Sequence, residues 1–203
     1  MKGHLHLRFF PPSTGFIQGG RAFKPESSDL PKLEAQLAQA KSLLLQDHAQ
    51  KDGQGQDDDG GILPVGVGFV LFSECAASHF GQTTVPILAH HRPAAVWLFA
   101  PDPSRPETLG LVIGALRSHS NSNSNSAWNP RIVVQVGTVA AAREAASLGA
   151  DVIVAQGVDA GGHGFVNVGS FVSLVPEIKD MLQEEFLGRE IAVWAAGGIA
   201  DGR

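Results

Sequence analysis

Cysteine, tyrosine and long apolar runs are scarce or absent in this chain of 203 residues, and each absence excludes a class of function. The single Cys75 has no partner for an internal disulfide, so the composition predicts a reducing, cytoplasmic setting. Tyrosine is absent, which excludes phenol chemistry from any mechanism. Because no run of about 18 apolar residues occurs, we expect neither a bilayer-spanning helix nor a membrane partner.

Positive charge is also in short supply, since 15 Lys and Arg residues stand against 20 Asp and Glu, for a formal net charge of -5. Nucleic-acid-binding proteins need a basic field, so nucleic acid is not an expected partner. What the chain does hold is 43% hydrophobic residues and 24 glycines. This apolar content suffices for a buried core, and the length predicts one globular domain over residues 1–203.

Short apolar runs alternate with stretches of helical spacing. The run Arg131–Val136 predicts a buried parallel strand, and the helix after it begins at the N-cap Thr138 and ends at Gly149. Residues 151–157 predict the next strand. The remaining predicted strands lie at 15–20, 63–72, 94–100 and 190–198, and the remaining predicted helices at 30–46, 106–119 and 171–188. Two polar segments, 52–61 and 118–126, are predicted as flexible surface inserts.

Strands that alternate with helices indicate an α/β fold with a parallel sheet, either open and doubly wound or closed as a (β/α)8 barrel. No GxGxxG fingerprint follows any strand, which disfavours the open dinucleotide-binding fold. Glycines gather instead after strand ends, at residues 19–20, 157–164 and 197–198. Because a barrel brings these ends to one mouth, we predict an incomplete TIM-barrel-type fold with about six of its eight βα units.

The stretch VIVAQGVDAGGHG, residues 152–164, carries the strongest chemical signal. Its glycines allow backbone N–H groups to approach a phosphate or a flat ring. His163 lies among them, and an imidazole exchanges protons near neutral pH. The same residues also fit a tight connection with an exposed histidine. Gly197 and Gly198 likewise fit either a barrel phosphate loop or a plain turn, so spacing alone leaves both motifs open.

These motifs, preceded by QVGT at 135–138, resemble the nitronate monooxygenase family, formerly called 2-nitropropane dioxygenases. The resemblance is strongest over VQVGTVAAAREAASLGADVIVAQGVDAGGHG and AAGGIADGR, and continues more weakly back to about Gly15. It implies an FMN-dependent (β/α)8 barrel that oxidises alkyl nitronates, and in some members neutral nitroalkanes, with molecular oxygen. No metal is implied.

The resemblance also implies roles for individual residues. His163 would act as general base on a nitroalkane or steady the bound nitronate. The implied FMN contacts are Gln135, Gln156, Gly161, Gly162, Gly197 and Gly198. Two positions depart from the family pattern: Gly68 stands where many members have Asn, and Asp159 stands where Glu is usual.

The family pattern is matched here from near its second strand to just after its seventh, so the first and eighth strands have no counterpart in this sequence. We therefore expect FMN to be held weakly. Unpaired backbone groups at the open sheet edges lower the stability of the fold, and the loop after the eighth strand would have supplied the other half of the phosphate site. Two alternatives stay open. One is a flavin-dependent enoyl-ACP reductase, which needs an NAD(P)H site that the sequence does not reveal. The other is a non-catalytic remnant of the barrel.

Four other features carry potentially reactive side chains and are interpreted as structural or surface residues. They are Cys75, Met181, the pair His90–His91 and the acidic run Asp57–Asp59. The acidic run lies in a polar insert, and no further ligand set at ligand spacing accompanies the histidine pair. We expect no metal site.

Overall fold

The computed structural model describes residues 16–18, 29–52, 61–72, 79–99, 101, 104–122, 128–162, 164–166 and 168–199. The strands are β1 (Phe16–Gln18), β2 (Leu63–Val70), β3 (Pro93–Phe99), β4 (Arg131–Val136), β5 (Val152–Gln156) and β6 (Ala192–Ala196). The helices are α1 (Asp29–Asp52), α2 (Val85–His91), α3 (Glu107–Ser122), α4 (Val139–Ser147) and α5 (Phe171–Glu185). A π-helical turn, Phe80–Thr84, leads into α2.

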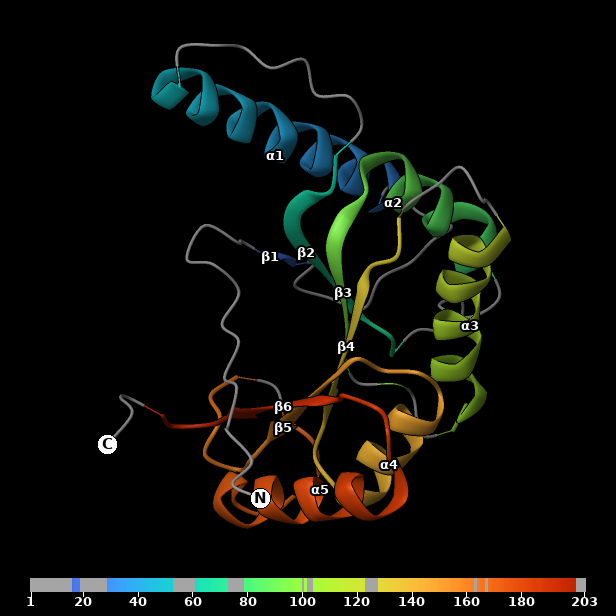
Figure 1. Cartoon of the computed structure of the whole chain (residues 1–203), viewed down its shortest axis with the longest axis vertical. Helices are drawn as coiled ribbons and strands as arrows, with labels where there is room; N and C mark the ends of the chain where they lie inside the picture. The colour runs from blue at the N-terminus through green and yellow to red at the C-terminus, as the bar shows by residue number, and fades with distance from the viewer. Residues whose placement is uncertain are drawn as a thin grey trace.

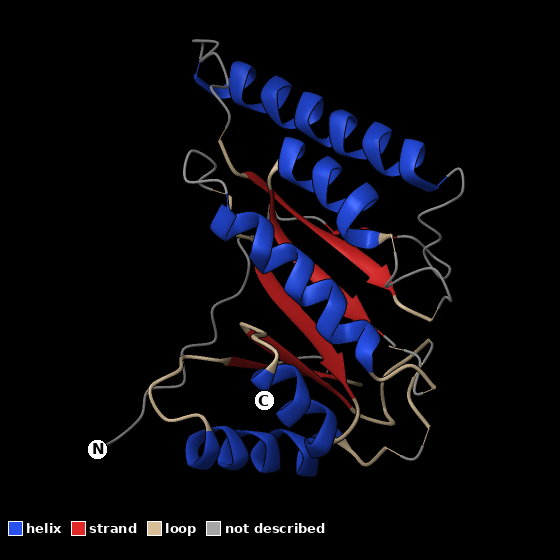
Figure 2. Cartoon of the chain, turned by 90° about the vertical axis from the view of Figure 1, so that its right-hand side faces the viewer, coloured by secondary structure: helices blue, strands red, loops and turns tan. Residues whose placement is uncertain are grey.

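The six strands form one parallel sheet in the order β1-β2-β3-β4-β5-β6 (Figure 1). A doubly wound sheet reverses its strand order at a switch point, whereas here every strand pairs with its neighbours in sequence. The helices all lie on one face of the sheet (Figure 2). Sequential parallel strands covered by helices on one side are the wall of a (β/α)8 barrel, so the predicted incomplete barrel is confirmed.

The sheet curls toward the face that carries no helices. On that face the rings of Trp97 in β3 and Trp194 in β6 lie with their centroids 6.2 Å apart. In a flat sheet, three strand spacings of about 4.8 Å would separate these two strands by roughly 14 Å. The contact therefore identifies this face as the concave, luminal side of the barrel wall.

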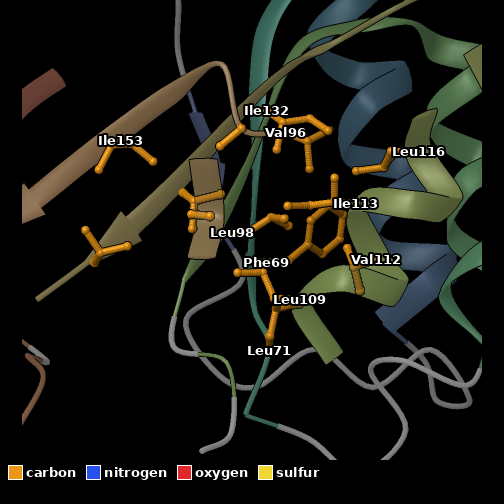
Figure 3. Close-up of a cluster of buried hydrophobic side chains, with 14 of the residues drawn as sticks. Phe69, Leu71, Val96, Leu98, Leu109, Val112, Ile113, Leu116, Ile132 and Ile153 are labelled. Atoms are coloured by element: carbon orange, nitrogen blue, oxygen red, sulfur yellow. The ribbon is translucent and has the colours of Figure 1, made fainter. Parts of the chain in front are cut away.

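Side chains along each strand alternate between the helices and the lumen. In β4, Ile132 and Val134 join the main core under the helices, while Val133 belongs to a separate luminal cluster. One part of the main core lies where β2, β3 and β4 meet α3 (Figure 3). The luminal cluster consists of buried Ala95, Val133, Val152 and Val154, with Trp97, Ala192, Trp194 and Ala196 packed against it.

A charged network ties α3 to the amino ends of β4 and β5. Arg117 of α3 donates to Asp151 Oδ2 at 2.7 Å and to the Gly149 carbonyl at 2.9 Å. Asp151 Oδ2 also accepts a 2.7 Å hydrogen bond from the Ile132 N–H. Because β4 and β5 begin beside this network, it stabilises the end of the sheet opposite to the strand carboxyl ends.

The predicted strands and all four predicted helices are confirmed, including the Thr138 N-cap, whose Oγ1 accepts from Ala141 N–H at 3.2 Å. Three features differ from the prediction. Helix α2 was not predicted, α1 continues to Asp52, and α3 continues to Ser122, so residue 52 and residues 118–122 are helical rather than part of the inserts. Insert positions 53–60 and 123–127 lie outside the described residues. Within the described part of the chain, no helix is long and apolar enough to cross a membrane.

Candidate cofactor site at the carboxyl ends of the strands

The loop after β5 and the turn after β6 lie against each other. The Gly157 N–H donates to the Ala196 carbonyl at 2.9 Å, which joins the two strand ends. A Cβ on Gly197 would lie 3.1 Å from the Ala160 nitrogen, and a Cβ on Gly198 would lie 3.4 Å from Asp159 Cβ. The two glycine motifs of the sequence therefore share one end of the barrel wall.

The glycines at this end differ in what surrounds them. A Cβ on Gly157 would lie 2.4 Å from the Phe171 nitrogen, and one on Gly137 would lie 2.3 Å from Val168 Cγ1, so the backbone and loop pack too closely there for any side chain. Gly161 and Gly162 are exposed, and no atom of the described residues lies within 4 Å of a Cβ built on either. Close packing thus requires glycine at Gly137 and Gly157, whereas Gly161 and Gly162 leave their backbone open to a ligand. Gly162 also needs glycine for its φ of 79°.

A chain of polar side chains crosses the luminal side just below this loop. The Trp97 indole N–H donates to Gln135 Oε1 at 2.9 Å, and Gln135 Nε2 donates to Gln156 Oε1 at 2.9 Å. An indole N–H is a donor only, so it fixes which amide atom of Gln135 accepts. The Gln135 NH2 group is thereby directed at Gln156 Oε1, and this bond in turn fixes which atom of the Gln156 amide faces Gln135.

Gln156 ends this chain in a buried position beside the glycine loop. It is the last residue of β5 and only 3% exposed, and its Nε2 lies 3.7 Å from the position of a Cβ on Gly164. With its oxygen engaged by Gln135, Gln156 presents its amide NH2 group toward the loop. A donor held in place by burial suits an acceptor atom of a bound ring.

Aromatic side chains cover the adjacent strand ends. The ring of Phe165, from the loop after β5, meets the ring of Phe99 at the end of β3 edge to face, with centroids 5.3 Å apart. The same Phe165 would lie 2.9 Å from a Cβ on Gly137 at the end of β4. The β5 loop therefore folds over two neighbouring strand ends and shields them with an apolar surface.

The acidic residue of the loop is directed at the start of α5. Asp159 Oδ2 accepts a 3.1 Å hydrogen bond from Ser170 Oγ, and Ser170 caps α5 by accepting from the Val172 N–H at 3.3 Å. A carboxylate at a helix N-terminus is favoured by the helix dipole. Asp159 therefore helps to hold the loop after β5 against the start of α5 through Ser170.

The structure places six of the seven predicted site residues at the same end of the sheet, namely Gln135, Gln156, Gly161, Gly162, Gly197 and Gly198. His163 lies outside the described residues, as do Cys75 and Asp57–Asp59. Sequence reasoning missed Trp97, Phe99 and Phe165. The alternation of β3 carries a signal for Trp97, because its neighbours Val96 and Leu98 face the helices and Trp97 must then face the lumen.

Known proteins resemble this chain in sequence and fold. A family model described as Nitronate monooxygenase matches residues 112–203. A Neurospora crassa protein named Nitronate monooxygenase is 44% identical over 93% of this chain and 48% of its own length, and the Metarhizium robertsii Nitronate monooxygenase npaC is 38% identical over 70% and 36%. The chain thus spans about half the length, or less, of these relatives. In fold, a FabK mutant from Thermotoga maritima matches with a TM-score of 0.50 and 23% identity over 93% of this chain and 54% of that one.

Proposed function

This chain belongs to the nitronate monooxygenase family, and from that premise we propose that it binds FMN and oxidises alkyl nitronates, and neutral nitroalkanes, with molecular oxygen. The observation that carries the proposal is the meeting of the glycine turns after β5 and β6 at one end of the sheet, where Gly161 and Gly162 are exposed. Shape and hydrogen-bonding groups suited to a flat ring and a phosphate meet at the strand ends, where barrel enzymes bind their ligands.

The residues present fit a flavin mononucleotide. Gly161 and Gly162 leave the space that a phosphate needs near backbone N–H groups, and Gly198 brings a second turn beside them. Gln135 and Gln156 supply amide groups of fixed direction for the polar edge of the ring. When bound, FMN would supply the electron acceptor that the protein side chains lack, with oxygen as the final acceptor.

The chain's own residues would then position the substrate and handle its proton. His163 follows Gly162 directly in the sequence, so its imidazole is assigned the proton on the carbon next to the nitro group of a neutral nitroalkane. With a nitronate, which has already lost that proton, the same imidazole would donate a hydrogen bond to the anion. Phe99 and Phe165 would exclude water from the strand ends.

The proposal is tested with the 203-residue chain purified and supplied with FMN. We expect FMN binding, and oxygen consumption with both a nitronate and the parent nitroalkane. His163→Ala should lower turnover of the neutral nitroalkane by about 100-fold or more, the range for loss of a general base, and spare FMN binding. Turnover of the preformed nitronate should fall less.

His119→Ala, which changes a histidine on α3 near Trp128, is the matched control and should leave both rates unchanged. Absence of FMN binding by the wild-type chain would refute the proposal. Unchanged nitroalkane turnover in His163→Ala would remove that residue from the mechanism. NAD(P)H consumption without nitronate would instead support the enoyl reductase alternative.

A further inference from the structure

A set of metal-ligating side chains lies at the end of the molecule opposite to the cofactor site. Glu34 comes from α1, and His90 and His91 come from the last turn of α2. One ligand atom from each lies within 4.8 Å of the others. Glu34 Oε1 and His91 Nε2 are 2.7 Å apart, and the two imidazole rings meet edge to face with centroids 4.8 Å apart. The carboxylate was missed in the sequence because 57 positions separate it from His91.

Packing fixes the two helices that carry these side chains. Leu33 and Leu37 bury one side of α1 in the main core, and Glu34 lies at the edge of that buried side. Helix α2 ends at His91 because Arg92 adopts the left-handed region, with φ 56°, and its N–H caps the Leu88 carbonyl at 2.7 Å. His91 is consequently buried while His90 is exposed. Both views show α1 and α2 next to each other, away from α4 and α5 (Figures 1 and 2).

We propose that Glu34, His90 and His91 bind one divalent cation of the zinc class, which ties α1 to α2. Two imidazole nitrogens with one carboxylate oxygen are a ligand set that Zn²⁺ and Co²⁺ accept, whereas Mg²⁺ and Ca²⁺ prefer oxygen ligands throughout. The cation takes the place of the hydrogen bond between Glu34 Oε1 and His91 Nε2, and Nε2 binds it as an unprotonated nitrogen. Water takes the fourth position.

The ligand atoms, which lie within 4.8 Å of one another, must draw together to bind one cation. The ligand atoms of a tetrahedral zinc ion stand about 3.3 Å apart, as follows from bond lengths of about 2.0 Å. The Glu34–His91 pair is already close to that separation, at 2.7 Å. His90 is exposed and the Glu34 side chain is 45% exposed, so both have freedom to move inward without disturbing the core.

Cobalt titration tests the site, because tetrahedral Co²⁺ has a visible absorption band that zinc removes by competition. The metal-free chain should take up one Co²⁺ at this site. Glu34→Gln keeps an oxygen that accepts from His91 but removes the charge, and His90→Ala changes an exposed residue, so both variants should fold normally. Each should bind at least about tenfold more weakly, since loss of even an outer-sphere partner costs about 10- to 100-fold.

Two matched controls separate this site from other histidines. His119→Ala and the double variant His4→Ala/His6→Ala should both bind Co²⁺ like the wild type. Zinc should also raise the unfolding midpoint of the wild type but not of Glu34→Gln, because a ligand stabilises only the state that binds it. The proposal is overturned if the wild type takes up no Co²⁺, or if Glu34→Gln and His90→Ala both bind it with wild-type affinity.

Discussion

At the scale of single residues, the glycines near the strand ends fall into two groups: some are needed by the fold, and others are proposed to be needed by a ligand. Gly137 and Gly157 have no room for a Cβ, so substitution there would displace the loop after β5 whether or not a cofactor binds. Gly161 has no described atom within 4 Å of a built Cβ and no positive φ, so none of the described residues requires glycine at this position. The proposed FMN phosphate would supply such a requirement.

Gly161→Ala tests this distinction. We expect the free energy of unfolding to change by no more than about 0.5 kcal/mol, because the new methyl group meets no described atom. FMN affinity should fall by about tenfold or more, which is about 1.4 kcal/mol, because the methyl group occupies space assigned to the phosphate. Fluorescence titration with FMN measures the second effect, and thermal unfolding measures the first.

Gly114→Ala is the matched control, since Gly114 lies on α3 and a Cβ built on it also meets no described atom within 4 Å outside the backbone of its own helix. It should stabilise the helix by about 0.5 to 1 kcal/mol and leave FMN affinity unchanged. Equal FMN affinity in Gly161→Ala and the wild type would place the phosphate elsewhere.

A second residue-scale prediction concerns Trp97, which sets the direction of the glutamine chain. Trp97→Phe keeps an aromatic ring in the lumen but removes the donor to Gln135. Without this donor, the side-chain amides of Gln135 and Gln156 can rotate so that their oxygen and NH2 group exchange places. We therefore expect FMN affinity to fall by about 3- to 10-fold, which is the value of one hydrogen bond. The side-chain NH2 signals of Gln135 and Gln156 in NMR spectra should shift even without FMN.

Trp128→Phe controls for the loss of a buried indole hydrogen bond, because Trp128 donates to the Pro93 carbonyl at 2.8 Å outside the luminal cluster. It should lower stability without changing FMN affinity or the glutamine signals. Identical losses of FMN affinity in the two variants would mean that Trp97 acts through general stability alone.

At the scale of elements, the strands were predictable because a parallel strand that is buried on both faces consists of a short run of apolar residues. Helix α2 was not, because its segment is short, contains Pro86, and has no side-chain cap at His79 or Thr84. Burial of Phe80, Val85 and Leu88 stabilises it instead, and that contact depends on the tertiary structure. Helix α3 also continues beyond its predicted end, and there the Ser120 hydroxyl donates to the Leu116 carbonyl one turn earlier in the same helix.

The contact between α4 and α5 makes a prediction about pH. Arg143 binds Glu185 with two parallel hydrogen bonds of 2.7 and 2.8 Å. These bonds lower the pKa of Glu185 in the folded state. The pair therefore stabilises the fold fully above the usual Glu pKa of about 4.3, and this contribution is lost as pH falls through the lowered folded-state value.

Thermal unfolding of the wild type and Glu185→Gln from about pH 3 to about pH 7 measures this effect, because this range includes the usual Glu pKa of about 4.3. The wild type should have the higher midpoint near neutral pH, and the difference should shrink below pH 4 and in high salt. Glu184→Gln changes the adjacent exposed glutamate, which is not the Arg143 partner, and should show no such trend. A difference that stays constant down to pH 3 would contradict the assignment.

At the scale of the whole molecule, the sequence was sufficient to predict that two glycine turns meet at one end of a barrel wall. It was not sufficient to predict the Trp97–Gln135–Gln156 chain, because each hydrogen bond joins residues at different heights on neighbouring strands. Strand register and sheet curvature decide such contacts. The Glu34–His91 pair was hidden for the same reason, since α1 and α2 meet only when the barrel wall forms.

The curled sheet predicts a gradient of stability from its centre to β6. Every residue of β5 is buried between two neighbouring strands, whereas β6 pairs only with β5 among the described strands and its residues are half-buried or exposed. Local opening costs less free energy at such an edge. In hydrogen exchange, amides of β6 should therefore exchange before those of β4 and β5, and FMN should slow exchange most near Gly197 and Gly198. Equal protection of β6 and β4 in dilute, FMN-free protein would show that another surface covers this edge.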